Sequence, residues 1–562
     1  MEKCLNGQSI PENWRDSIIW PIHKKGSKTN AENYRGIAIG NAIYKLYANI
    51  VNSRLENFIE SQNILPDTQN GFRKLRSTTD NIYILNHIIN SKLHNGKKIY
   101  AFFVDFKSAF DTIDRSLLFK KLEKLNVPEY IIGAIKDLYR RTPFKVQDRR
   151  FYTERGLKQG CPLSPLLFAI YISDLEKTLR NYQSGGIVIG KQKVFSLAYA
   201  DDLVILSERK EDMREMMELL SRYTKRKALT INKAKSQIVV FSRGGRKTKE
   251  AWGLDGFSIT EVSSFKYLGF TFQANGKYTK HNEDMAATGK RRVAEVWGIG
   301  HWKFEDNFSI RMEMFKSLIL PAITYGAEIT GWSEWESIEL TQRRYLRWIL
   351  GLDRGTRKAV LMEETKTSPM YIETGVKAMK YEERIRNSPC LILRECLIEV
   401  HKGLKNNWTD MRSKYCNRNG WAVEEVNAAL SRGESVWHPL MMRDMECWQQ
   451  LQFNRLQSSH YRFLQTSRVP WYLQRGRNVR LIARFRCGNE ERGRDKWGTD
   501  HRCRICGEAI ETVDHLRESC CPDQRNYTSL LNERGNGEGW MRRVLNARKA
   551  KQMSNEVQII VN

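Results

Sequence analysis

Three acidic residues at the ends of apolar runs limit, more than any other feature, what this sequence can fold into. Residues 99–106 (IYAFFVDF) form a short, nearly continuous apolar run, typical of a strand buried on both faces, and Asp105 lies at its end. Asp201 and Asp202 lie between two further strand-like runs, which predicts a tight β-hairpin with both acids at its tip. Carboxylates among apolar strands are costly unless cations neutralise them.

Two Mg²⁺ ions held about 4 Å apart would neutralise such acids and would hold the attacking and leaving oxygens of a phosphoryl transfer. That chemistry needs a 3′-hydroxyl aligned with an α-phosphate and positive charge where negative charge develops. Asp also favours turns. The Asp201-Asp202 pair alone therefore fits an ordinary turn as well as a metal site.

The charge balance indicates a polyanionic partner. Lys and Arg number 93 and Asp and Glu number 64, so the formal charge is +29. Such an excess favours nucleic acid over an anionic membrane surface, although a merely basic soluble enzyme is also consistent with it. No run of about 18 apolar residues predicts a membrane helix, and the amino terminus is not a secretory signal. Eleven Cys, an odd number, favour a reducing compartment.

The chain is long enough for two to four domains. Periodicity and turn residues predict helices over 41–60, from Thr79 or Asp80 to Gly96, from Asp114 to Leu125, over 166–172 and over 211–228. Strands are expected over 99–106, 194–199, 203–206, 237–242 and 265–272. From about 283 to 480 the pattern is mostly helical, with a break at Pro321.

Seven segments, taken in their order, are far more specific than any single motif. They are WPIHKKGSKTNAENYRGIAI (20–39), NGFRKLRSTTDNI (70–82), FVDFKSAFD (103–111), RGLKQGCPLSPLLF (155–168), YADD (199–202), LTINKAKS (229–236) and FKYLG (265–269). This order resembles the reverse transcriptase of non-LTR (LINE-type) retrotransposons, over roughly residues 11–330.

The resemblance implies an α+β fold, a right-hand polymerase with fingers, a palm with an antiparallel sheet, and a helical thumb. A helical connector and a small zinc knuckle would follow. The expected boundaries are 1–250 for fingers and palm, 251–340 for a primer-grip-like strand and helical thumb, 341–480 for the connector, 481–525 for the CCHC knuckle and 526–562 for a basic tail. The implied activity is RNA-directed DNA polymerisation with two Mg²⁺ ions, which extends a DNA 3′ end on an RNA template with deoxynucleoside triphosphates.

Carried over by position, Asp105, Asp201 and Asp202 correspond to the metal-binding, catalytic acids of the palm. Phe110 matches an aromatic residue that packs against the sugar of the incoming nucleotide, where a ring would collide with a 2′-hydroxyl. Phe110 also fits a core position, and the two roles are compatible. Gln159 matches the Gln-Gly beside nucleotide and template.

Basic residues complete the implied nucleotide site. Lys24 and Arg35 match finger positions that contact the triphosphate through charge-assisted bonds, and Lys25 competes with Lys24 for that role. Lys158 stands where many relatives have Pro or Arg. Lys235 matches a lysine proposed to protonate the pyrophosphate leaving group, while an exposed lysine that offsets phosphate charge is the alternative.

A second constellation lies near the carboxyl end. Cys503, Cys506, His515 and Cys520 follow C-x2-C-x8-H-x4-C, which predicts one tetrahedral structural Zn²⁺ without an open position. Cys521 could replace Cys520, and scattered buried cysteines are the alternative. LINE-type proteins carry a similar knuckle, thought to bind nucleic acid. Nearby arginines would contact phosphates or form plain surface: Arg484, Arg486, Arg502 and Arg504.

The sequence begins close to the first finger segment, so a truncated member that lacks an endonuclease domain is expected. A catalytically decayed remnant that only binds nucleic acid is the rival interpretation, and a group II intron-type maturase fits the Cys/His pattern poorly. The expected partners are RNA template, DNA primer or target and deoxynucleotides, without a membrane, and the oligomeric state is open. The family implies an intracellular protein that acts in the nucleus after a cytoplasmic ribonucleoprotein stage.

Overall fold

A computed structural model describes residues 4, 8–24, 26–140, 142–146, 149–248, 250–457, 459–491 and 501–561. Lys25 and residues 492–500 of the predicted knuckle lie outside this part of the chain. The chain divides into two compact units, the first formed by residues 1–278 and 382–410, the second by 279–381 and 411–562. Within the described residues, no helix is long and apolar enough to cross a membrane.

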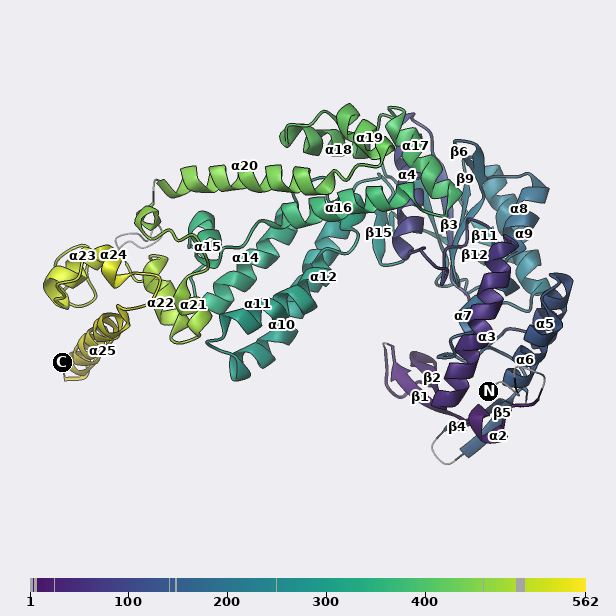
Figure 1. The fold of residues 1–562 in the computed structure, drawn as a ribbon, viewed down its shortest axis with the longest axis horizontal. Helices are drawn as coiled ribbons and strands as arrows, with labels where there is room; N and C mark the ends of the chain where they lie inside the picture. The colour runs from purple at the N-terminus through teal and green to yellow at the C-terminus, as the bar shows by residue number, and fades with distance from the viewer. Residues whose placement is uncertain are drawn as a thin grey trace. The chain divides into compact units, whose positions relative to one another are not determined.

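The first unit mixes helices and sheets (Figure 1). Its helices are α2 (Glu12–Arg15), η1 (Ala31–Asn33), α3 (Ala42–Ser61), α4 (Thr78–His94), α5 (Arg115–Lys124), α6 (Glu129–Tyr139), α7 (Ser164–Tyr171), α8 (Leu175–Tyr182), α9 (Lys210–Arg226) and α17 (Leu391–His401). Its strands are β1 (Ser17–His23), β2 (Tyr34–Gly40), β3 (Ile99–Val104), β4 (Thr142–Val146), β5 (Arg149–Thr153), β6 (Ile187–Ile189), β7 (Gln192–Val194), β8 (Ser196–Tyr199), β9 (Asp202–Ser207), β10 (Gln237–Phe241), β11 (Gly253–Leu254), β12 (Phe257–Ser258), β13 (Thr260–Glu261), β14 (Ser264–Tyr267) and β15 (Phe270–Gln273). The α+β class is confirmed.

A five-stranded sheet of order β13-β10-β3-β9-β8 forms the centre of this unit. All six residues of β3 are buried, as the apolar run predicts, and β3 pairs antiparallel with both β9 and β10. Phe102 faces the core shared with α7 and α9, whereas the ring of Phe103 stacks on Phe265 of β14 at 4.2 Å. The strand is thus covered on both faces, which explains why it lacks the alternation of a half-exposed strand.

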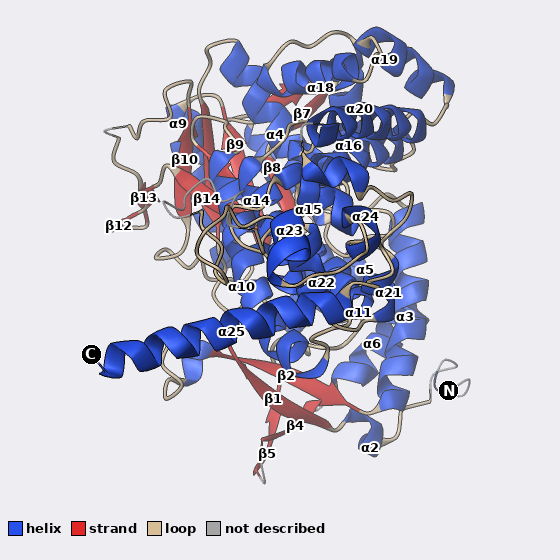
Figure 2. Ribbon diagram, turned by 90° about the vertical axis from the view of Figure 1, so that its left-hand side faces the viewer, coloured by secondary structure: helices blue, strands red, loops and turns tan. Residues whose placement is uncertain are grey.

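A second sheet, of order β2-β1-β4-β5, lies apart from the first (Figure 2). Its long hairpin pairs β1 with β2 antiparallel and sets Ile22 opposite Arg35. The edge strand β2 also contacts the turn-rich segment after β5, because the amide of Ala38 donates to the carbonyl of Gln159 at 2.7 Å. This contact fixes Gln159 against the sheet.

The structure confirms several predicted elements and corrects others. The helices expected over 41–60 and 211–228 are α3 and α9. The single strand expected over 265–272 is wrong, because Leu268 and Gly269 adopt positive φ values of 48° and 84° and turn the chain into the β14–β15 hairpin.

The predicted start of the second helix is also wrong. Ser77, rather than Thr79 or Asp80, precedes α4 as its N-cap. Asp80 instead accepts a hydrogen bond from the Ser77 amide at 2.8 Å, which completes a capping box.

Part of the predicted connector belongs to the first unit. Helix α17 packs along α4 (Figure 1). There Glu399 pairs with His87 at 2.7 Å and accepts a hydrogen bond from the amide of Gly190 at 2.6 Å. The amide of Leu391 donates to Asp67 at 3.1 Å.

The described residues of the second unit are mostly helical, as the pattern predicts for residues 283–480. Its helices are α10 (Thr279–Lys303), α11 (Phe308–Met314), the π-helical η2 (Phe315–Ile319), α12 (Leu320–Ile323), α13 (Ala327–Thr330), α14 (Glu336–Leu350), α15 (Lys358–Thr365), α16 (Met370–Arg386, which runs into the first unit), α18 (Asn407–Arg418, which begins in it), α19 (Val423–Arg432), α20 (Trp437–Gln457), η3 (His460–Phe463), α21 (Trp471–Arg475), α22 (Val479–Arg486), α23 (Val513–His515), the π-helical η5 (Leu516–Cys520), α24 (Tyr527–Leu530) and α25 (Glu538–Val561). Pro321 does not end the helical region: it lies in α12, directly after the π-helical turn that accommodates it.

A buried lysine joins the smaller sheet to α3. Lys158 is only 3% exposed, and its Nζ donates to the carbonyl oxygen of Arg15 at 2.9 Å and to Ser17 Oγ at 3.4 Å. The ammonium also lies 4.1 Å from the centroid of the Tyr44 ring. Burial lowers the pKa of Lys158 to about 8, because the site lacks the water that solvates a charged amine.

Lys158→Met is therefore expected to change how stability depends on pH. Between about pH 8 and the unfolded pKa of roughly 10.4, the unfolded chain binds more protons at this residue than the folded chain, so the free energy of unfolding rises with pH. In urea denaturation, the free energy of unfolding of wild type relative to that of Lys158→Met should increase by roughly 1 kcal/mol per pH unit in this window. The exposed Lys136→Met is the control, and equal slopes for all three proteins would contradict the assignment.

Candidate active site and metal centre

Strand pairing brings the three predicted acids together. Val104 pairs with Leu203, and β9 begins at Asp202, so Asp105 and Asp202 leave their neighbouring strands at the same end. Tyr199 pairs with Asp202, which leaves Ala200 and Asp201 as the two-residue turn between β8 and β9. The predicted hairpin is confirmed, with Asp202 as the first strand residue after the tip.

These carboxylates repel one another. Partial loss of hydration, with the charges of Asp201 and Asp105, raises the pKa of Asp202 to about 6, and Arg35 opposes the shift. The pKa of Asp201 is raised for the same reasons, against its own backbone amide and Arg35. Such a concentration of acids in one place suits divalent cations with oxygen ligands.

The segment that contains Lys235 wraps around Asp105. The amide of Asp105 donates to Ser236 Oγ at 3.0 Å, and its carbonyl accepts from the amide of Asn232 at 2.7 Å. Lys235 lies between these two contacts and is exposed. The backbone of Lys235 therefore lies close to that of Asp105.

The predicted nucleotide residues come from the segment after β3, the turn after β5 and the β1–β2 hairpin. The ring of Phe110 is half-buried and stacks on the fully buried Phe168 at 5.0 Å, so it is firmly packed. The amide of Gln159 donates to both carboxylate oxygens of Asp111, at 3.1 and 3.2 Å. Lys24 and Arg35 are exposed on the β1–β2 hairpin.

Electrostatics places these two cations near the site. Loss of hydration raises the pKa of Asp111, while Gln159, Lys24 and Arg35 lower it. Arg35 also acts on Asp201 and Asp202. Among the residues that the structure describes, neither Lys24 nor Arg35 has a carboxylate within ion-pair distance, so both remain available for an anionic ligand.

Four side chains near the carboxyl end form a compact donor set, here the Cys/His cluster: Cys503, Cys506, His515 and Cys520. Their ligand atoms all lie within 4.8 Å of one another. Cys503 Sγ is 3.7 Å from Cys520 Sγ, and His515 Nε2 is 3.3 and 3.4 Å from the sulfurs of Cys520 and Cys506. These separations fit the edges of a tetrahedron around zinc, about 3.5–3.8 Å for bonds of the usual lengths.

Two thiols of the cluster have pKa values shifted in opposite directions. Backbone amides of Ala509 and Glu508 lower the pKa of Cys506 to about 6, which favours the thiolate. Burial and the neighbouring thiols raise the pKa of Cys520 to about 12. Cys521 is outside the cluster, and its carbonyl accepts a hydrogen bond from Trp540 at 2.9 Å.

Comparisons with known proteins agree with this geometry. Residues 22–272 match the family model described as reverse transcriptase (RNA-dependent DNA polymerase). The chain is 24% identical over 409 residues to the "Probable RNA-directed DNA polymerase from transposon BS" of Drosophila melanogaster, which covers 70% of this chain and 44% of the relative. It is 30% identical over 282 residues to a Pol polyprotein from the type-1 retrotransposable element R2 of Popillia japonica, covering 48% and 39%.

Residues 22–272 form a reverse transcriptase domain of the LINE type. The chain spans less than half of the length of these two curated relatives. Among solved structures, telomerase from Candida albicans in complex with a fragment of telomeric RNA matches 84% of this chain and 67% of its own. The TM-score is 0.38 at 12% identity.

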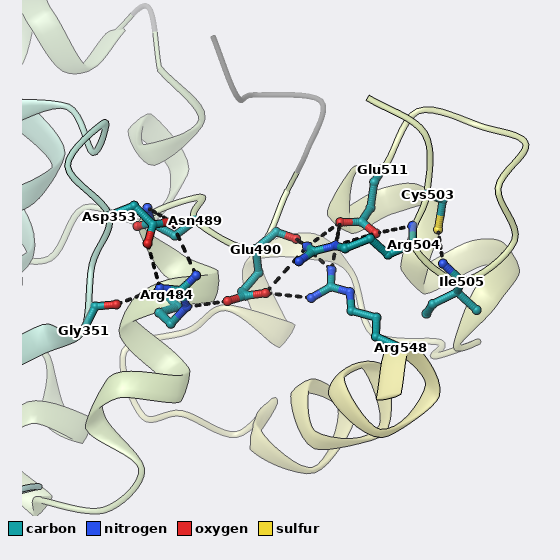
Figure 3. Close-up of polar contacts among 10 residues, drawn as sticks. All are labelled: Gly351, Asp353, Arg484, Asn489, Glu490, Cys503, Arg504, Ile505, Glu511 and Arg548. Carbon is teal, nitrogen blue, oxygen red and sulfur yellow. Dashed lines mark hydrogen bonds and ion pairs between the residues drawn. The ribbon is translucent and has the colours of Figure 1, made fainter. Parts of the chain in front are cut away.

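Three of the four arginines near the Cys/His cluster have acidic partners within the protein, and Figure 3 shows the contacts of Arg484 and Arg504. Arg486 is 1% exposed and pairs with the fully buried Glu364, so the prediction that it contacts phosphate is wrong. Arg484 pairs with Asp353 and Glu490.

The same ion-pair network reaches the knuckle itself (Figure 3). Arg504 pairs with Glu511, and Arg548 of α25 contacts both Glu490 and Glu511. The segment around the Cys/His cluster is therefore joined to α22 and α25 by a network of partly buried charges. Arg502 pairs through its backbone with Ile510.

The sequence did not reveal the residues that hold the β8–β9 hairpin of the reverse transcriptase domain. The buried Gln69 accepts hydrogen bonds through Oε1 from the amides of Gly71 and Ala200, at 2.9 and 3.1 Å. Ala200 has φ +55°, a conformation that costs about 1 kcal/mol or more for a residue with a Cβ. A Cβ on Gly71 would lie 2.4 Å from the Ala200 nitrogen, so this approach requires glycine.

Two further contacts support the strand before the turn. The amide of Asn81 donates to the carbonyl of Ala198 at 3.0 Å and to the hydroxyl of Tyr267 at 3.2 Å. Tyr267 in turn donates to the carbonyl of Leu197 at 3.2 Å. The segment NGFRKLRSTTDNI thus helps to position the β8–β9 hairpin that carries Asp201 and Asp202.

Gln69→Leu should loosen this hairpin. It leaves two buried amides without an acceptor, at an expected cost of about 1–3 kcal/mol in the free energy of unfolding. Native-state hydrogen exchange at the Ala200 amide should accelerate at least about tenfold. The exposed Gln62→Leu is the matched control, and unchanged protection of Ala200 in Gln69→Leu would refute the role of Gln69.

Proposed function

We propose that this chain is an RNA-directed DNA polymerase that extends a DNA 3′ end on an RNA template, in a fold that is a right-hand polymerase. The observation that carries the proposal is the placement of Asp105, Asp201 and Asp202 at one end of adjacent strands within a LINE-type reverse transcriptase domain. The expected boundaries between fingers and palm, thumb, connector, knuckle and tail are part of the same proposal.

The three acids would hold two Mg²⁺ ions, because their crowded negative charge fits oxygen-ligated cations. When bound, such ions supply Lewis-acid stabilisation of the charge that develops on the phosphate oxygens. The surrounding network keeps the acids fixed while a 3′-hydroxyl and a nucleotide are aligned, since misplacement of reacting atoms is costly.

The basic and aromatic residues would bind and select the nucleotide. Lys24 and Arg35 are exposed cations that face the acids and would bind the triphosphate. The ring of Phe110, held by Phe168, would exclude a 2′-hydroxyl. Lys235, carried by the loop around Asp105, would donate a proton to the pyrophosphate or offset its charge.

The proposed partners are an RNA template, a DNA primer or target and deoxynucleoside triphosphates, with action in the nucleus. The formal charge of +29 suits phosphate contacts whose strength depends on salt. The rival function is a remnant that binds nucleic acid without polymerising. Nothing in the arrangement of the three acids favours that rival, since all three carboxylates are present and held together.

Primer extension tests the polymerase. With an oligo(dT) primer on poly(A), Mg²⁺ and dTTP, wild type should incorporate nucleotide, and Asp202→Asn should reduce the rate by roughly 10²-fold or more because it removes one metal-binding charge without changing shape. Asp410→Asn, an exposed acid on α18, should retain wild-type activity. No incorporation by folded wild-type protein would leave only the binding function.

We further propose that the Cys/His cluster binds one structural Zn²⁺, with Cys520 rather than Cys521 as the fourth ligand. The tetrahedral spacing of the donors supports this assignment. Because the knuckle shares its core with α22 and α25, the metal would stabilise the end of the second unit as a whole.

Metal analysis and thermal unfolding test the zinc site. Wild type should carry one zinc per chain, and Cys503→Ser and Cys520→Ser should each lose it and lower the melting temperature. Cys521→Ser should keep its zinc, since that thiol is not in the donor set. Zinc retained by Cys520→Ser but lost by Cys521→Ser would reverse the assignment.

A further inference from the structure

The chain leaves the first unit after Tyr278 and comes back to it with residues 382–410, here called the return segment. The family match ends at residue 272, so the return segment lies outside it. Helix α4 contacts both β8 of the central sheet and α17 of the return segment, and most of its residues are buried, polar ones included. The buried ring of Trp408 in the return segment meets that of Tyr83 edge-on at 5.6 Å. The return segment is therefore part of the core around α4.

The start of α17 holds Asp67. Leu391 is the first residue of α17, where the backbone amide has no partner within the helix. This amide donates to Oδ2 of Asp67 at 3.1 Å, and Oδ1 of the same carboxylate accepts from Arg76 at 2.7 Å. The thiol of the buried Cys390 donates to the carbonyl oxygen of Asp67 at 3.6 Å. The return segment thus contacts both the side chain and the backbone of Asp67.

The residues that follow Asp67 hold strand β8. The amide of Ala198 donates to the carbonyl of Thr68 at 2.8 Å, and the carbonyl of Ala198 accepts from the amide of Asn70 at 3.0 Å. Thr68 and Asn70 are both buried, so water does not compete for these bonds. Residues 67–70 are therefore a buried support for the strand that leads to the β8–β9 turn.

We propose that the return segment is part of the catalytic fold, in which the amide of Leu391 and the carboxylate of Asp67 position the acids of the β8–β9 hairpin. The inference rests on the proposed polymerase function. Leu391 holds Asp67, and the next residues hold Ala198. Asp201 follows only three positions later in the chain.

This chain of contacts depends on a distant part of the sequence. Leu391 and Asp67 are 324 positions apart, so their bond forms only when the return segment has docked on α4. Loss of the bond frees the support, and small displacements of metal-binding acids are costly for the alignment of reacting atoms. The positioning of the acids thus requires residues well beyond the segment 22–272 that matches the family model.

Leu391→Pro removes the amide that binds Asp67 and changes little else. Proline is tolerated at the first position of a helix, and Cys390 before it already has an extended backbone, with ψ 110°. The side chain of Leu391 is 46% exposed. Leu391→Ala is therefore the matched control, because it shortens this exposed side chain and keeps the amide.

Hydrogen exchange on the full-length protein measures the support directly. In Leu391→Pro, the amides of Asn70 and Ala198 should exchange at least about tenfold faster than in wild type, because a hydrogen bond to a charged group is lost. The amides of the central strand β3 should keep their wild-type rates, which distinguishes local loosening from general destabilisation. Leu391→Ala should match wild type at all of these amides.

Primer extension on a preannealed oligo(dT)–poly(A) duplex measures the consequence for the reaction. In Leu391→Pro, kcat should fall roughly fivefold or more, whereas KM for dTTP should stay within about twofold of wild type. This split is expected because the support acts on the acids rather than on the proposed nucleotide residues.

Asp67→Asn is a second variant of nearly unchanged size, which decides the matter if Leu391→Pro does not fold. Asparagine offers one oxygen to the two donors that Asp67 now accepts, so the same two amides should exchange faster.

The inference is overturned if the folded variants exchange at Asn70 and Ala198 as wild type does, or if β3 exchanges faster by the same factor. An unchanged kcat in a variant with faster local exchange also overturns it. Wild type that incorporates no nucleotide would defeat the proposed polymerase function instead, because the exchange rates decide the role of the support without any activity.

Discussion

The antiparallel register between β3 and β9 is the constraint on which the candidate active site depends. It sets Val104 opposite Leu203, and the acids follow at the same end of both strands. A shift by one residue would turn the side chains of a strand to the opposite face of the sheet and would separate Asp105 from the hairpin. Because every residue of β3 is buried, such a shift would also disrupt packing on both faces, so the core protects the register.

The acids are costly to assemble, and the surrounding structure compensates for that cost. Burial and mutual repulsion raise the pKa values of Asp201 and Asp202, and Ala200 adopts a conformation unusual for a residue with a side chain. Gln69 holds the turn through its backbone. A strained backbone persists only where neighbouring residues hold it in place, and such strain is common at sites where side chains must be held in one geometry.

Prediction from the sequence was most successful for elements whose structure depends mainly on local residue patterns. Local hydrophobic patterning predicts both the buried strand β3 and the turn at Asp201 between two apolar runs. The β1–β2 hairpin was not predicted as strands, because Pro21 and Gly36 interrupt the pattern and half of its residues are exposed. Turn chemistry at Leu268 and Gly269 was overlooked in an otherwise strand-like segment.

The remaining errors concern contacts between distant segments, which periodicity does not encode. That Gln69 contacts Ala200 follows only from the tertiary fold, as does the return of α17 onto α4. The roles predicted for the three acids, the nucleotide residues and the zinc ligands remain predictions, although the structure brings each group together.

The arginines of the second unit show why net charge is a poor guide to a binding surface. Arg486, Arg484 and Arg504 already have carboxylate partners inside the second unit, so a count of basic residues overstates how many of them can bind a ligand. Lys24 and Arg35 are exposed and without an ion-pair partner among the described residues. A cation binds phosphate well when no carboxylate competes for it. By this criterion the exposed cations of the small sheet remain better candidates for the proposed phosphate contacts than Arg484, Arg486 and Arg504.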